Sequence, residues 1–312
     1  MLLVGLSLST AQAAEETGPD SDPSPQTYDL GPHFITPRTT RYEFWEHHAT
    51  TMRLVGPHGE KETETTVMIE GHVIWKVEDV NADGGATCVL TMPWISATFQ
   101  VADQRERKVD TRDDDGGEDP MMRWFRTLVE TPRVYEMNPD GSVGRFNSLD
   151  AVHSAVGEGG ELIDEEVFIE EGSSTATLPG ASEQTVLNAE WERREVWSRN
   201  YGGIASKTNH TMQFRLGSVE SVADIPVATV TGSGSIEVNL ESDEIDLTSS
   251  HGEAESKIMF DMDRHEVVAR NSVETVHLEV TMTFDQFTIT QIVDERTHGQ
   301  LLRIEEDQGG ED

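Results

Sequence analysis

The chain has 312 residues, of which 59 are acidic and 23 basic, giving a formal net charge of −36. This excess of carboxylates argues against nucleic acid and anionic membrane surfaces as partners, because Lys and Arg must displace the counterions of phosphate groups. The length allows one large or two modest domains with a hydrophobic core. Cys88 is the single cysteine, which excludes an intramolecular disulfide and a thiolate metal cluster within one chain.

The first residues predict export. Residues 1–13 combine an apolar run with the small-residue pattern AQA, which is typical of a signal peptide cleaved after Ala13, although a positive n-region is missing. Residues 14–38 and 306–312 are acidic and offer little to bury, so we expect a disordered linker and a disordered tail. No later apolar run has the length of a membrane span. We therefore expect a periplasmic or extracellular protein, and a monomer because its charge is self-repelling.

Alternation of apolar and polar residues predicts antiparallel strands. In TVMIEGHVIWKV, Val67, Ile69, Val73, Trp75 and Val77 share one face, and VHLEVTMTF at 276–284 alternates in the same way. The segments NADGG at 81–85 and NPDGS at 138–142 carry the residues that tight turns between strands require. Cys88 lies inside the alternating segment ATCVLTMPW, where a buried small hydrophobic residue is expected.

One segment instead predicts a helix. In EDPMMRWFRTL, Asp119 is suited to the N-cap and Pro120 to the first helical position. Met121, Trp124, Phe125 and Leu128 then recur at helical spacing. This stripe either packs on a sheet or lines a ligand cavity, and the sequence leaves both alternatives open.

Two pairs of segments are similar in sequence. NSLDAVH at 147–153 matches NSVETVH at 271–277, and VEDV at 77–80 matches VESV at 219–222. We therefore expect two divergent β-rich repeat units, 39–155 and 189–305, joined by a connection at 156–188. The first NSLDAVH copy continues as a short helix in this interpretation, whereas the second continues as a strand. The predicted fold is mainly β, with antiparallel sheets, half-barrel-like curvature and one or two short helices.

The order of these phrases resembles an uncharacterised exported β-rich family of planctomycete-type bacteria. The resemblance rests on PRVYEMNPDGSVGRFNSLDAV and on LPGASEQTVLNAEW. The family phrase LP-x-x-x-V-x-x-G-x-x-W matches Leu178, Pro179 and Trp191, but its glycine is absent and the spacing is stretched. The resemblance implies a fold and export, and no activity, because the family has none assigned.

The sequence contains no recognisable catalytic motif, and it predicts no cofactor and no set of metal ligands. Nucleophile elbows, phosphate loops and dinucleotide fingerprints are missing. DTRDDDGG, in the acidic loop 110–119, fails the EF-hand template, which leaves only a looser calcium site open. His47 and His48 would point to opposite faces of a strand and could not chelate one metal. TGSGS at 231–235 is expected to form a bulge or turn.

Three functions fit this sequence. The first is an exported non-catalytic binding or structural protein with an envelope protein as partner. The second is a periplasmic carrier of a hydrophobic ligand, held in a curved-sheet cavity lined by Met121, Trp124, Phe125 and Leu128. The third, less favoured, is a hydrolase assembled from scattered Asp, Glu and His. A concave pocket of several hundred cubic ångströms would favour the carrier.

Overall fold

The structure, a computed structural model, describes residues 26–102, 104–113, 120–156, 184–201, 204–240, 245–284 and 287–304, with short stretches between 168 and 181. The predicted signal peptide at 1–13 and tail at 306–312 lie outside these residues. The mainly β, antiparallel fold is confirmed. Its strands are β1 (Thr27–Tyr28), β2 (Arg38–Gly56), β3 (Gly59–Val80), β4 (Ala86–Val101), β5 (Arg107–Asp110), β6 (Arg133–Met137), β7 (Val143–Phe146), β8 (Thr185–Val186), β9 (Glu190–Tyr201), β10 (Ile204–Val222), β11 (Ile225–Leu240), β12 (Asp246–Asp261), β13 (Glu266–Phe284) and β14 (Phe287–Ile304).

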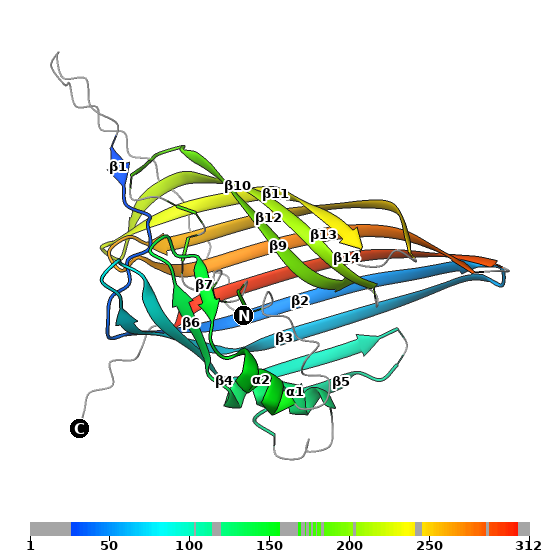
Figure 1. Ribbon diagram of the computed structural model, residues 1–312. Helices are drawn as coiled ribbons and strands as arrows, with labels where there is room; N and C mark the ends of the chain where they lie inside the picture. Colours follow the sequence, from blue (N-terminus) through cyan, green and yellow to red (C-terminus); the bar gives the residue numbers. More distant parts are fainter. Residues whose placement is uncertain are drawn as a thin grey trace, which may run out of the picture.

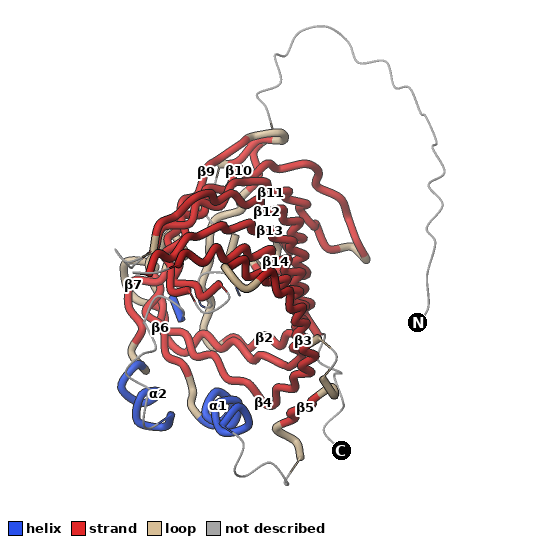
Figure 2. The backbone as a smooth tube through the Cα atoms, turned by 90° about the vertical axis from the view of Figure 1, so that its right-hand side faces the viewer, coloured by secondary structure: helices blue, strands red, loops and turns tan. Residues whose placement is uncertain are grey.

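Twelve of these strands form one sheet, with the order β7-β6-β4-β3-β2-β14-β13-β12-β11-β10-β9 and β5 on β4. Every neighbouring pair is antiparallel. The last strand, β14, lies beside β2, so both predicted repeat units belong to one continuous sheet. In Figure 2 the strands follow a strongly curved path, so that one face of the sheet is concave. Within the described residues β7 and β9 are not paired with each other, so the sheet is curved but not closed.

Two helices flank one end of the sheet. Helix α1 (Pro120–Glu130) packs on β4 and on α2 (Leu149–Val156), and the two helices lie side by side in Figures 1 and 2. The helix predicted from Pro120 onward is therefore confirmed. Its expected N-cap, Asp119, lies outside the described residues.

The predicted alternation is confirmed in the long strands. Val73, Trp75 and Val77 are buried in β3, and the residues between them are more exposed. Val276, Leu278 and Val280 repeat this pattern in β13. The two turn segments also lie where they were predicted, 81–85 between β3 and β4 and 138–142 between β6 and β7.

The two similar segments diverge as expected. Leu149–Val156 of the first copy forms α2, whereas residues 271–277 of the second lie inside β13. Each half of the sheet is a meander: β2, β3, β4, β6 and β7 form the first, and β9 to β14 form the second, with β5 as a side strand on β4. The hairpins β6–β7 and β12–β13, which lead into the two segments, both join the fourth and fifth strands of their meander. An internal duplication stays a prediction.

Two local predictions need correction. The linker expected over 14–38 is structured from residue 27, because Thr27–Tyr28 pairs with Thr185–Val186 and Leu30 is fully buried. The segment 231–235 is neither bulge nor turn but lies within β11. Its glycines leave room for neighbours, since a Cβ at Gly232 would lie 2.7 Å from the Phe214 ring.

The apolar side chains form three clusters. The first lies between α1 and strands β2–β7, and it includes Tyr42, Trp75, Cys88, Phe125 and Tyr135. The second gathers Leu30, Leu178, Phe214, Leu216, Val230, Ile258, Phe260 and Val267. The third lies toward the far ends of β11–β14, with Ile236, Val238, Ala254, Val276, Leu278, Val280 and Val293. Cys88 is fully buried as predicted, and burial raises the pKa of its thiol to about 12.

Candidate ligand-binding cavity

A cavity of about 440 Å³ lies on the concave face of the sheet. Its walls come from β2, β3, β4, β9, β10, β12, β13, β14 and α1, together with Phe168 and Thr175 of the segment between α2 and β8. Side chains alternate along each strand, so every second residue reaches the cavity: His210, Met212 and Phe214 on β10, and Arg270, Ser272 and Glu274 on β13. The cavity lies where the three apolar clusters meet, because its lining takes residues from each.

Much of the wall is apolar. This part of the lining consists of Phe44, Val73, Met92, Trp124, Leu128, Phe168, Trp197, Met212, Phe214, Ala254, Ile258 and Leu301. A volume of several hundred cubic ångströms with mainly apolar walls and a few polar groups is characteristic of sites for small organic ligands.

The four residues predicted to line a cavity take three different positions. Trp124 and Leu128, one helical turn apart on α1, line the cavity. Phe125 is instead 4% exposed within the first cluster. Met121 lies at the surface, with 36% of its area exposed. The strand residues of the lining were not predicted, because an inward residue that faces a cavity has the same alternation as one in a filled core.

The polar part of the wall contains two arginines. Arg193 forms an ion pair with Glu195, two residues along on the same face of β9. Arg270 of β13 donates a hydrogen bond to the carbonyl oxygen of Thr177 at 3.3 Å, and its Nε has no acceptor among the residues that the structure describes. No carboxylate lies within ion-pair distance of Arg270 among the described residues.

Burial changes the electrostatics of Arg270. Desolvation is the main cause that lowers its pKa to about 10, and the neighbouring charge of Arg193 adds to it. The guanidinium therefore stays protonated at neutral pH although the side chain is largely removed from water. A buried cation without a carboxylate partner is costly, and an anionic ligand group would supply the missing partner.

Two histidines complete the wall. His48 contacts Glu46 through Nε2 at 3.2 Å and Thr297 through Nδ1 at 3.1 Å. His210 is 2% exposed, and its ring lies 3.5 Å from that of Trp197. His47 instead stacks on Trp45, so the adjacent histidines point to opposite faces, as the sequence predicted.

A second hollow, of about 510 Å³, lies between the two edges of the sheet. It is bordered by the β6–β7 turn, by Leu178 and its neighbours, and by β9. Arg193, Glu195 and Trp197 line both hollows. Strand β9 therefore stands between the interior cavity and the gap at the sheet edge.

The predicted acidic loop is only partly described, because residues 114–119 lie outside the described part. Asp110 pairs with Arg112 at 2.6 Å and with Lys108 at 3.6 Å. The hydrogen bond from Arg112 is the main cause that holds the pKa of Asp110 well below its usual range. Arg112 also lies 3.9 Å over the Trp94 ring. The Asp110 carboxylate is thus engaged by protein cations.

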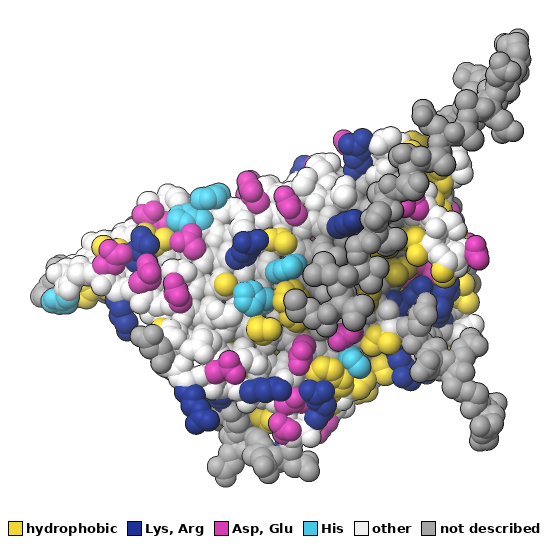
Figure 3. Space-filling view, turned by 180° about the vertical axis from the view of Figure 1, so that it is seen from behind, with side chains coloured by type: hydrophobic (Ala, Val, Ile, Leu, Met, Phe, Trp, Pro, Cys, Tyr) yellow, Lys and Arg dark blue, Asp and Glu magenta, His cyan; other side chains and the backbone are white. Residues whose placement is uncertain are grey.

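The outer surface differs from the cavity. On the face shown in Figure 3, acidic, basic and histidine side chains are interspersed over the sheet. Within the described residues, no helix has the length and apolar character needed to cross a membrane.

Comparisons with known proteins define no family for this chain. No protein-family model matches it, and no curated protein matches it either. Among solved structures, lipovitellin, from a structure titled for its lipid–protein interactions, is 10% identical with a TM-score of 0.47. The match covers 86% of this chain and 25% of that one, so this chain spans about a quarter of the length of lipovitellin.

Two further solved structures resemble this chain less. OccK5 of Pseudomonas aeruginosa is 7% identical with a TM-score of 0.16, over 85% of this chain and 99% of that one. The translocator domain of the autotransporter NalP from Neisseria meningitidis is 8% identical with a TM-score of 0.16, over 84% and 89%. Scores and identities this low carry no functional argument. The resemblance to an exported bacterial family stays a prediction.

Proposed function

We propose that the protein is an exported, non-catalytic, monomeric carrier of an amphipathic ligand that has an apolar chain and an anionic group. The observation that supports this proposal is the 440 Å³ cavity, whose wall combines apolar side chains with the buried, carboxylate-free Arg270. The apolar chain lies against Trp124, Leu128 and Phe214. The anionic group accepts hydrogen bonds from Arg270.

The energetics of such a complex are favourable. Each buried methylene contributes about 0.8 kcal/mol, so a chain of about ten methylenes contributes roughly 8 kcal/mol before the entropic cost of association. A hydrogen bond to a charged group adds about 1.5–3 kcal/mol. The anionic group therefore accounts for roughly a 10- to 100-fold difference in affinity from a neutral ligand of the same length.

A route into the cavity follows from β9. This edge strand contributes Arg193 and Trp197 to the interior cavity and also to the hollow between the sheet edges. A ligand that enters at this gap meets the paired Arg193 before it reaches Arg270. Displacement of β9 would widen this route without breaking the centre of the sheet, since β9 pairs only with β10 among the described strands.

The test is calorimetric titration of delipidated protein with laurate and, separately, with dodecanol. We expect one laurate per chain and roughly 10- to 100-fold weaker binding of dodecanol. Ser272→Phe fills the cavity and should abolish binding of both ligands. Asn271→Phe is the matched control, because the neighbouring residue is exposed on the opposite face of β13.

Arg270→Gln separates the two parts of the proposal. Glutamine is polar but has no charge, so laurate should bind about as weakly as dodecanol. Equal binding of both ligands by the unchanged protein would refute the role of Arg270 and leave an apolar carrier. No binding of either ligand would refute the carrier and favour a structural component with a protein partner. Circular dichroism of each variant checks that it folds.

A further inference from the structure

Three potential metal ligands from distant parts of the chain meet outside the cavity. Asp29 and His33 lie in the segment before β2, and His265 lies in the β12–β13 turn. One ligand atom of each residue lies within 4.8 Å of the other two. The rings of His33 and His265 are 4.1 Å apart, and His33 Nε2 lies 2.9 Å from Asp29 Oδ2.

The backbone of Gly31 orients two of these ligands. Its N–H donates to Asp29 Oδ1 at 3.1 Å, which leaves Oδ2 directed at His33. Its carbonyl oxygen lies 3.1 Å from His265 Nδ1. A carbonyl oxygen only accepts, so Nδ1 carries the proton and Nε2 presents a lone pair. Metal-bound histidines are held in this way, with the second ring nitrogen donating to a carbonyl or carboxylate.

The turn that carries His265 is held in a disfavoured conformation. His265 has φ of 52°, in the left-handed region that L residues other than glycine rarely adopt. Residues kept in such conformations cluster at functional sites, where the surroundings impose the geometry. Here the surroundings are a network of buried ion pairs on both sides of the turn.

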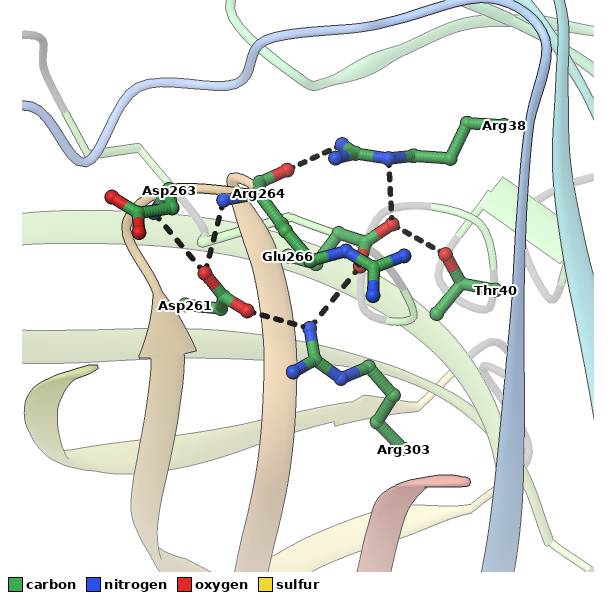
Figure 4. A network of polar contacts seen from close by, with 7 residues as sticks. All are labelled: Arg38, Thr40, Asp261, Asp263, Arg264, Glu266 and Arg303. Carbon is green, nitrogen blue, oxygen red and sulfur yellow. Dashed lines mark hydrogen bonds and ion pairs between the residues drawn. The ribbon is translucent and has the colours of Figure 1, made fainter. Parts of the chain in front are cut away.

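Figure 4 shows this network. Asp261 Oδ1 accepts hydrogen bonds from the backbone N–H groups of Asp263 and Arg264 at 3.1 and 2.9 Å. Arg303 bridges Asp261 and Glu266 at 2.9 and 3.3 Å. The two ends of the turn are therefore fixed to β14, and the position of His265 is preorganised.

We propose that Asp29, His33 and His265 form a binding site for a divalent transition metal ion, with Zn²⁺ as the best match. Two imidazoles and one carboxylate are a common zinc set, and they leave a fourth position for water. Imidazole nitrogen disfavours Ca²⁺ and Mg²⁺, which take oxygen ligands. On binding, the proton on His33 Nε2 is released to solvent, and the lone pair of that nitrogen binds the metal beside Asp29 Oδ2.

The site has a structural consequence and does not depend on the carrier function. Its three residues are absent from the lining of both hollows. A bound ion would fasten the segment before β2 to the β12–β13 turn. Because the ion binds the folded state alone, the unfolding temperature rises with the logarithm of the free metal concentration once that concentration exceeds the Kd.

The test is titration of EDTA-treated protein with Zn²⁺ in competition with a chromophoric chelator, together with the visible spectrum of the Co²⁺ form. We expect one equivalent per chain, tetrahedral Co²⁺ bands and a higher unfolding temperature with Zn²⁺. His265→Gly removes a ligand, and glycine suits the left-handed φ, so this variant should fold. It should bind Zn²⁺ about 10- to 100-fold more weakly.

His33→Ala should weaken Zn²⁺ binding in the same way. His58→Ala is the control, because His58 is exposed in the β2–β3 turn and does not belong to the group of three ligands. Absence of stoichiometric Zn²⁺ binding in the unchanged protein would overturn the proposal. So would full retention of binding in both His265→Gly and His33→Ala, since the ion would then occupy other histidines.

Discussion

Replacing Arg303 by Met should destabilise the fold by about 3 kcal/mol. Arg303 has a side chain only 8% exposed, and it lies between Asp261, which is fully buried, and Glu266, which is 6% exposed. Removing one partner of a buried ion pair costs about 3–5 kcal/mol, because the remaining charge is left without compensation.

The lower end of this range applies here for a structural reason. Glu266 keeps Arg38 at 3.1 Å and Arg264 at 3.3 Å. Asp261 keeps two backbone donors on Oδ1 but loses the guanidinium at Oδ2. At about 2.1 cal/mol/K of unfolding entropy per residue, a loss of 3 kcal/mol in a chain of this size lowers the unfolding temperature by about 5 °C.

Urea unfolding followed by tryptophan fluorescence measures the change. Arg296→Met is the matched control, because Arg296 is exposed on the same strand and should change stability by less than about 0.5 kcal/mol. Adding Asp261→Asn to Arg303→Met should recover part of the loss, since the buried charge is removed. Equal effects of Arg303→Met and Arg296→Met would refute the argument.

Two further predictions concern a strand glycine and an acidic side chain. Gly234→Ala should cost about 2 kcal/mol, because its Cβ would lie 2.1 Å from the Thr211 carbonyl oxygen; at Gly217 the nearest atom is 3.5 Å away. Thermal unfolding should distinguish the two alanine variants, and equal shifts would contradict this explanation. Asp110→Asn should flatten the acid limb of the stability profile. Arg112 lowers the pKa of Asp110 from 3.8, so its stabilisation is present above that value and is lost as pH falls through the lower folded pKa. Denaturant unfolding from about pH 5 to about pH 2 checks this, and parallel profiles would contradict it.

Local features of the fold could be predicted because they depend on local physics. Period-two burial requires only that one face of a strand meets the core, and Val73 and Trp75 follow it. Pro120 supplies the fixed φ of a first helical turn. The two similar heptapeptides are succeeded by different residues, and this context determined that one is α2 and the other part of β13.

The neighbours of each strand could not be predicted in this way. Alternation says which side chains point inward, but it does not say that β2 pairs with β14. It also does not distinguish a filled core from a cavity, since that depends on how strongly the sheet curves. The connection at 156–188 contributes Phe168 to the cavity wall, although its residues show no period that would predict this position.

One signal for the cavity was present in the sequence. Extending the inward phase of Val276 and Leu278 backward along the same strand places Glu274, Ser272 and Arg270 on the buried side. A charged residue at an inward position indicates a partner or a site. The proposed metal ligands could not be predicted for another reason: Asp29 and His33 lie in a segment whose composition predicts a disordered linker, where no site is expected.

The order of strands places the first and last strands of the large sheet at its centre and the middle of the chain at its margins. β14 and β2 form the central seam, whereas β7 and β9, from the middle of the chain, form the two margins of the sheet among the described strands. A protease cut in the connection between α2 and β8 would therefore leave two complete meanders joined by the hydrogen bonds of the seam. The intact chain must bring its beginning and end together late in folding, because contacts between remote segments form slowly. Synthesis of β14 is thus the event that joins the two halves into one sheet.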